Sequence, residues 1–155
     1  MPIVFARVDD RLIHGQVVQA WLPELNVDEV LIPVSKGKEN QVNTRLLRLS
    51  LPYEYKLTVL NSHECARYTL DAKQRIFLLM SSLKELTDVI SDGLQLESVN
   101  IGGMHFKEKA QKLADNVFLD EEDKHFLKII NDLGIRIETR AVPNAQSISV
   151  KEVLL

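Results

Sequence analysis

The sequence predicts an α/β fold, in which a single domain holds a mostly parallel open sheet with helices on both faces and an antiparallel edge strand. Short apolar runs alternate with longer stretches of helical periodicity along the chain. This alternation is typical of parallel strands joined by crossover helices. The 155 residues contain no repeat, low-complexity tract or linker. We therefore expect one domain over residues 1–155, large enough to bury a proper core.

Strands are expected at short runs of apolar and β-branched residues, which are nearly continuous where both faces of a sheet are covered. Arg7 is the exception in the first run. Pro33 cannot donate to a strand ladder, so it belongs near the end of the second strand or at an edge. The last run alternates strictly and should have one wet face. The predicted strands are residues 2–8, 29–34, 55–60, 74–80, 98–101, 116–119 and 135–142.

Helices are expected between these strands, where apolar residues recur at helical spacing or a capping signal is present. Pro23 should end or kink the first helix. Ser82 and Glu85 form a capping box for the fourth. The predicted helices are residues 17–25, 39–50 (with an apolar stripe at Val42, Leu46, Leu47 and Leu49), 62–70, 82–93 and 120–133.

Some side chains and segments have only a structural interpretation. Trp21 and the leucines of the 39–50 stripe are expected in the core. Cys65 has no metal-ligand spacing around it and is expected to be a buried thiol. Residues 105–115 are polar and carry no clear pattern. The tail, residues 143–155, is expected to end in a short helix at 150–155.

The polar cluster of the chain, Asp9-Asp10-Arg11-Leu12-Ile13-His14-Gly15-Gln16, lies between the first strand and the first helix. Loops at the carboxyl ends of parallel strands converge, and ligands bind there. Because His14 comes just before the helix, the unpaired N–H groups of the first helical turn should form an anion site. The sequence therefore predicts a site for a phosphoryl group, whose transfer mainly needs positioning and charge neutralisation.

Each residue of this loop has a role in that interpretation. The imidazole of His14 would attack phosphorus and later give the group away, and Arg11 would pair with two phosphoryl oxygens at once. Gly15 would leave room for the phosphate. Asp10 or Asp9 would hydrogen-bond the other imidazole nitrogen, and the spacing alone does not choose between them. The plainer interpretation is a solvated histidine with turn-capping carboxylates.

The other histidines have weaker cases. His63 and His125 lie among charged residues of predicted helices and should be at the surface. His105 follows Gly102-Gly103 at the end of the fifth strand, where it could lie on the active edge, although a structural role is favoured. The two glycines are too few for a dinucleotide-binding fingerprint.

The composition excludes several classes of function. A net charge of −3 argues against a nucleic-acid partner, which needs a basic face. One cysteine allows no internal disulfide, which fits a reducing cytoplasm. No signal peptide or membrane-spanning run is visible. No metal or organic cofactor is implied.

The segment RVDDRLIHGQVVQAW resembles the start of the enzyme IIB component of the mannose/fructose/sorbose family of the phosphoenolpyruvate-dependent sugar phosphotransferase system. The similarity continues in SVNIGGMHF (98–106) and FLDEEDKHFLKIINDLGI (118–135) and covers nearly the whole chain. The resemblance implies that His14 accepts a phosphoryl group from a phosphohistidine on a IIA component. His14 would then transfer it to a sugar bound by membrane IIC/IID components.

The resemblance also assigns residues and partners. Arg11, Gly15 and Gln16, with Asp10, match the family's active-site loop, and Ser81 falls where the family has a second loop lining the site. The resemblance also suggests a homodimer. One region departs: after the second strand the family has an acidic, alanine-containing segment, whereas this chain has Ser35-Lys36-Gly37-Lys38-Glu39-Asn40-Gln41, of which Ser35 alone matches.

Three other functions are alternatives to this one. The altered 35–41 loop motivates a regulatory phosphohistidine carrier without a cognate sugar transporter. A receiver-like signalling domain would need an aspartate at the end of the third strand, where this chain has Asn61. A non-enzymatic nucleotide-binding module has no glycine pattern to support it. The sugar phosphotransferase function is preferred.

Overall fold

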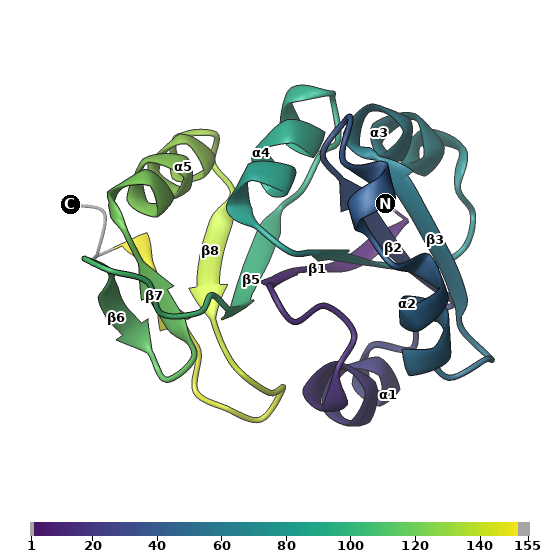
Figure 1. The fold of residues 1–155 in the computed structure, drawn as a ribbon, viewed down its shortest axis with the longest axis horizontal. Helices are drawn as coiled ribbons and strands as arrows, with labels where there is room; N and C mark the ends of the chain where they lie inside the picture. Colours follow the sequence, from purple (N-terminus) through teal and green to yellow (C-terminus); the bar gives the residue numbers. More distant parts are fainter. Residues whose placement is uncertain (1, 152–155) are drawn as a thin grey trace.

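A computed structural model describes residues 2–151 of the chain, and Figure 1 shows its fold. The main sheet has seven strands in the order β3-β2-β4-β1-β5-β8-β9, parallel except that β9 runs antiparallel to β8. β6 and β7 form a separate antiparallel pair. The strands are β1 Ile3–Asp9, β2 Glu29–Val34, β3 Lys56–Asn61, β4 Ile76–Met80, β5 Ser98–Gly103, β6 Gln111–Ala114, β7 Val117–Leu119, β8 Arg136–Thr139 and β9 Ile148–Ser149. The predicted α/β fold with an antiparallel edge strand is confirmed.

Helices cover both faces of the main sheet, as predicted. In Figure 1, α3, α4 and α5 lie along one face, and α1 and α2 lie on the other. The helices are η1 Val17–Trp21 (a π-helix), α1 Leu22–Leu25, η2 Glu39–Gln41 (a 3₁₀-helix), α2 Thr44–Ser50, α3 Ser62–Asp71, α4 Leu83–Ser91 and α5 Glu121–Asp132. Asn43, Asn61, Ser82 and Asp120 cap α2 to α5 in turn through hydrogen bonds to backbone N–H groups.

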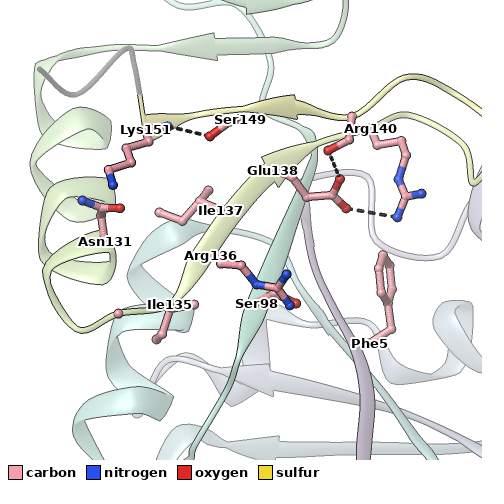
Figure 2. A pocket seen from close by; sticks show the side chains of 12 residues that line it. Phe5, Ser98, Asn131, Ile135, Arg136, Ile137, Glu138, Arg140, Ser149 and Lys151 are labelled. Atoms are coloured by element: carbon pink, nitrogen blue, oxygen red, sulfur yellow. Dashed lines mark hydrogen bonds and ion pairs between the residues drawn. The ribbon is translucent and has the colours of Figure 1, made fainter.

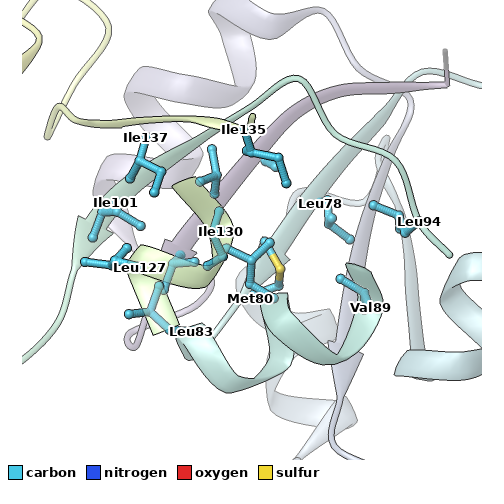
Figure 3. Close-up of a cluster of buried hydrophobic side chains, with 14 of the residues drawn as sticks. Leu78, Met80, Leu83, Val89, Leu94, Ile101, Leu127, Ile130, Ile135 and Ile137 are labelled. Carbon is cyan, nitrogen blue, oxygen red and sulfur yellow. The ribbon is translucent and has the colours of Figure 1, made fainter. Parts of the chain in front are cut away.

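Alternation along the strands divides the core into two clusters. Figure 3 shows the larger cluster, where Leu78 and Met80 of β4 meet Leu83 of α4 and Ile130 of α5. The smaller cluster lies on the opposite face and includes Trp21 and Phe77. Both clusters anchor β1 and β4, so the loops at the carboxyl ends of these strands are held by a rigid centre.

The first helix is continuous from Gly15 to Leu25 but contains a π-helical segment. The backbone N–H of Leu22 bonds to the carbonyl of Val17, five residues back. Pro23 has no N–H with which to continue an α-helical ladder. The helix therefore changes its winding around Pro23 and ends at Leu25, and Asn26 follows in the left-handed conformation (φ 51°).

The predicted helix over residues 39–50 is wrong in its extent. Val42 and Asn43 break it, because Asn43 caps a new helix that begins at Thr44. Its leucine stripe is also not a core stripe: the exposed fractions are 59% for Leu46 and 78% for Leu49, and Leu47 is half-buried.

Other predictions are confirmed or corrected in detail. Trp21 and Cys65 are buried, and His63 and His125 are exposed. The predicted strand over residues 135–142 covers only β8, because the chain leaves the sheet after Thr139. The unassigned stretch 105–115 contributes β6, which pairs with β7. The helix expected at 150–155 falls largely outside the described residues.

Candidate phosphoryl-transfer site

The polar loop after β1 lies at the carboxyl edge of the sheet, as predicted. β1 is the central strand and lies between β4 and β5. From β1 the chain crosses to β2, on one side of β1, whereas from β4 it crosses through α4 to β5, on the other side. Such a reversal of direction opens a crevice at the carboxyl ends of the strands. Asp9 is the last residue of β1, and the helix begins at Gly15, directly after His14.

Asp9 is fully buried and is the centre of the site. Its Oδ2 atom lies 2.8 Å from Nε2 of His14 and 3.1 Å from Nη2 of Arg7. Arg11 reaches the same carboxylate from the solvent side, with Nε 3.0 Å from Oδ1 and Nη2 3.1 Å from Oδ2. Of the two carboxylates that the sequence left open, Asp9 is therefore the one that contacts His14.

This contact fixes the orientation of the His14 ring. Leu12 adopts a left-handed conformation (φ 55°), and its N–H donates to the carbonyl of Asp9, so the loop turns back on the end of the strand. The side chain of His14 is 17% exposed. Because a carboxylate can only accept, Nε2 carries the proton in this contact. Among the contacts of residues 2–151, Nδ1 has no hydrogen-bond partner, which leaves it as the ring's free lone pair.

Arg7 forms a buried ion pair with Asp9, and this role was not predicted from the sequence. Its guanidinium is fully buried and donates to Oδ1 of Asn100 at 2.6 Å and to the carbonyl of Arg140 at 3.0 Å. It also lies over the ring of Trp21, with Cζ 5.2 Å from the ring centroid. The signal in the sequence was the single cation in an otherwise apolar strand.

The two glycines after β5 make room for these side chains. A Cβ atom at Gly102 would lie 1.9 Å from Cζ of Arg7, and one at Gly103 would lie 2.6 Å from Oδ1 of Asp9. Gly103 is also the register partner of Asp9 in the neighbouring strand. Because Gly102 and Gly103 have no side chains, the side chains of Arg7 and Asp9 can pack directly against the backbone of β5.

Charge and burial compete at Asp9. Burial alone would raise its pKa, but hydrogen bonds from Arg11 and His14 outweigh that effect, with help from the charge of Arg7. The pKa of Asp9 therefore lies below its ordinary value. Burial lowers the pKa of Arg7, against the opposing effect of Asp9. Asp9 is thus an anion that faces a buried cation on one side and His14 on the other.

The remaining predicted residues of the loop take different positions. Asp10 does not contact His14; its Oδ2 atom lies 2.5 Å from Nδ1 of His105, which is exposed and lies at the active edge. Gln16 accepts a hydrogen bond from Nη2 of Arg11 at 3.3 Å. A Cβ atom at Gly15 would meet no described atom within 4 Å, so the space beside His14 is open.

Ser35 and Ser81 lie together in a neighbouring cavity of about 340 Å³, at the ends of β2 and β4. Leu12 of the active-site loop also lines this cavity, whereas His14 and Arg11 do not. The N–H and hydroxyl of Ser81 both donate to Glu85, at 2.8 and 2.7 Å. Burial raises the pKa of Glu85 above its ordinary value.

A larger cavity of about 700 Å³ lies over β8 and β9. Figure 2 shows that Phe5, Arg136, Glu138 and Arg140 line it, with Glu138 and Arg140 pointing towards one another. No residue of the 9–16 loop lines this cavity. The larger cavity is not the candidate site, because His14, Arg7 and Arg11 converge on Asp9 and not on this cavity.

The described residues contain neither a metal-binding cluster nor a membrane-spanning helix. In residues 2–151, no cluster of three or more histidine, cysteine, aspartate or glutamate side chains is arranged to hold a metal ion. No helix in this range is long and apolar enough to cross a membrane.

Known proteins resemble this chain over almost its whole length. The profile of the family described as "PTS system sorbose subfamily IIB component" matches residues 3–155. The sorbose-specific EIIB component of Lacticaseibacillus casei is 32% identical over 145 residues, which cover 92% of this chain and 88% of that protein. The mannose-specific EIIAB component of Escherichia coli K12 is 29% identical, and the match covers 99% of this chain but 49% of that relative.

The fold has a solved counterpart in the same family. The crystal structure of the IIBSor domain of the sorbose permease from Klebsiella pneumoniae matches with a TM-score of 0.88 and 27% sequence identity. The match covers 98% of this chain and 95% of that one. Together with the family profile, this similarity shows that the chain belongs to the sorbose subfamily of IIB components of the phosphotransferase system.

Proposed function

We propose that this chain carries a phosphoryl group on Nδ1 of His14, accepted from a IIA phosphohistidine and delivered to a sugar during uptake through membrane IIC/IID components. The observation that supports this most directly is the 2.8 Å contact between Nε2 of His14 and the buried Asp9. That contact commits one ring nitrogen and leaves the other free to attack. We expect the protein to act in the cytoplasm, where its donor and the inner face of the transporter are accessible.

The first step is an in-line displacement at phosphorus. The lone pair of Nδ1 attacks, and the bond from phosphorus to the donor's histidine nitrogen breaks as the new bond forms. The His14 ring gains positive character because Nε2 keeps its proton, and the Asp9 carboxylate stabilises that charge. Arg11 is placed to neutralise the phosphoryl oxygens when it swings from Asp9, since its side chain is 40% exposed.

The second step returns His14 to its starting state. A sugar hydroxyl oxygen attacks phosphorus, the bond between phosphorus and Nδ1 breaks, and the hydroxyl proton is released. The open space beside Gly15 and the helix N-terminus that begins there leave room for the phosphoryl group during both steps. Gln16 helps to hold Arg11 in place between turnovers.

Intact mass and phosphorus NMR test the proposal. The protein is incubated with phosphoenolpyruvate, the general phosphotransferase proteins and a panel of mannose-family IIA domains. We expect one acid-labile phosphate on the wild-type chain and none on His14→Ala, which should stay folded because His14 lies in a loop. Labelling of His14→Ala to the wild-type level would remove His14 from the mechanism.

A regulatory carrier is the second candidate, and the basic 35–41 loop is the observation that favours it. In that case His14 is phosphorylated but the group signals to another protein. Membranes that contain candidate IIC/IID components distinguish the two functions. Sugar phosphate formed from the phosphorylated chain supports the transport function, and a phosphoprotein that no transporter discharges supports the regulatory one.

A further inference from the structure

We infer that the cavity beside the His14 loop, together with the cations around it, is the docking face for the phosphodonor protein, and that the donor presents carboxylates and an apolar side chain to it. This inference rests on the proposed function. The docking face consists of the 340 Å³ cavity, the loop 35–41 and the outer surface of α2. Leu12 connects the cavity to the loop that carries His14.

The docking face is positively charged on a negatively charged protein. Loop 35–41 contains two lysines, Lys36 and Lys38, and one carboxylate, Glu39, which leaves a net charge of +1 in a chain of net charge −3. Both lysines are exposed, and Lys38 lines the cavity. Arg45 on α2 is a further exposed cation. Within the described part of the chain, none of these three cations has a carboxylate within ion-pair distance, so an acidic partner would meet unpaired charges.

The same face exposes apolar side chains. Leu46 lines the cavity and is 59% exposed, and Leu49, one turn further along α2, is 78% exposed. Residues three apart on a helix lie on the same side. Leu12, Val42 and Leu47 give the cavity an apolar lining, to which Ser35 and Ser81 add polar groups. An apolar centre with a charged rim is the usual anatomy of a protein–protein interface.

A protein donor fits this face better than a small ligand does. The donor's phosphohistidine belongs to a folded protein, so surface contacts must bring it within bonding distance of His14. Glu85, the carboxylate that lines the cavity, already accepts two hydrogen bonds from Ser81. The unpaired cations at the rim would therefore steer a negatively charged protein surface towards the site.

Charge reversal tests the inference directly. The variant Lys36→Glu/Lys38→Glu is compared with Lys73→Glu/Lys128→Glu, in which both lysines are exposed but lie away from this face. The initial rate of His14 phosphorylation is measured against the concentration of the IIA domain that labels the wild type fastest. We expect the donor KM to rise about tenfold in the first variant, with kcat nearly unchanged, and to stay constant in the control. Added salt should raise the wild-type KM and barely change that of the variant.

A second pair of variants tests the apolar part. Leu46→Ser should raise the donor KM several-fold, whereas Leu70→Ser, at a position 79% exposed on α3, should not. Calorimetry with the unphosphorylated IIA domain repeats both comparisons without chemistry. If the wild type binds the IIA domain in a charge-dependent way but His14 is not labelled, the docking face stands and the proposed function fails.

Three results would overturn the inference. The first is an unchanged KM and Kd for the donor in both test variants. The second is a defect confined to sugar transfer from phosphorylated protein to transporter-containing membranes, which would assign the face to the transporter. The third is charge-dependent binding to phosphatidylcholine/phosphatidylglycerol vesicles without any change in donor binding, which would assign it to lipid.

Discussion

The two halves of the carboxyl edge of the sheet are built in opposite ways. The half at β1 and β5 is closed, and the half at β2 and β4 is open. On the β1–β5 side, Arg7 and Asp9 are fully buried and form an ion pair, and Arg7 also donates to Oδ1 of Asn100 and to the carbonyl of Arg140. On the β2–β4 side, an open cavity is lined by Lys38 and lies beside the loop that carries Lys36, and neither lysine has a carboxylate partner among residues 2–151. The first half fixes the position of His14, as the proposed phosphoryl transfer requires. The second half leaves charges available to another molecule.

Asp9→Asn should have the largest effect on stability, because Asp9 is the carboxylate that Arg7, Arg11 and His14 all contact. The amide keeps the shape but leaves the Arg7 guanidinium buried without its anion. We expect a loss of about 3–5 kcal/mol in the free energy of unfolding, measured by urea denaturation. A loss below about 1 kcal/mol would show that Asn100 and the backbone carbonyls satisfy Arg7 without Asp9.

Gly102→Ala should disturb the same half by sterics alone. The new Cβ would lie 1.9 Å from Cζ of Arg7, so the guanidinium must move. We expect a loss of about 1–3 kcal/mol in unfolding free energy, with slower His14 phosphorylation. Gly15→Ala is the control for stability, since its Cβ would meet no described atom within 4 Å. Equal stability of the two variants would contradict the tight packing around Arg7.

Arg11→Lys should lower the rate of phosphoryl transfer more than it lowers the stability of the closed half. An ammonium cannot reproduce the bidentate contact of a guanidinium with phosphoryl oxygens. We expect the rate of phosphoryl transfer to fall about tenfold or more. The urea midpoint should change less than in Asp9→Asn, because the lysine keeps a positive charge beside Asp9 and the side chain at this position is 40% exposed. Stopped-flow labelling of His14 checks this, and a wild-type rate would exclude Arg11 as the phosphoryl clamp.

The pH dependence of stability should also identify the closed half. Because the pKa of Asp9 is depressed in the folded state, its stabilising contribution is fully present above the ordinary value of 3.8 and is lost as pH falls through the folded-state pKa. Asp9→Asn lacks this contribution at every pH. The difference in unfolding free energy between the two proteins should therefore shrink in acid, and a constant difference would contradict the depressed pKa.

Ser81→Ala in the open half should have the smallest effect. It removes one hydroxyl donor to Glu85, while the backbone N–H of Ser81 still donates at 2.8 Å. We expect a loss of about 0.5–1.5 kcal/mol in urea denaturation. A loss as large as that of Asp9→Asn would mean that the two halves are equally rigid.

The same contrast explains what could be predicted from the sequence. The strands and the polar loop were predictable because apolar runs and a capping pattern are local signals. The choice of Asp9 over Asp10 was not, because it depends on strand direction: Asp9 points to the face that holds Arg7 and Trp21, and Asp10 turns to His105. The role of Gly102-Gly103 could not be predicted for the same reason, since Arg7 and Asp9, which occupy the space beside these glycines, lie about ninety residues earlier in the chain.

The leucine stripe of residues 39–50 shows the limit of periodicity. A helical pattern predicts an apolar face but not what covers it. Here Leu46 and Leu49 are exposed, and Leu46 lines the cavity. The departure of loop 35–41 from the family pattern was visible in the sequence, and the structure places it at the edge of the same surface.

We propose that Nδ1 of His14 carries the phosphoryl group, and the phosphohistidine isomer that forms tests this assignment. Nitrogen-15 and phosphorus NMR of the labelled protein distinguish the two phosphohistidine isomers. We expect phosphorylation at Nδ1, with Nε2 still protonated towards Asp9. Phosphorylation at Nε2 would contradict it, because the 2.8 Å contact with Asp9 would then have to break before the group could bind.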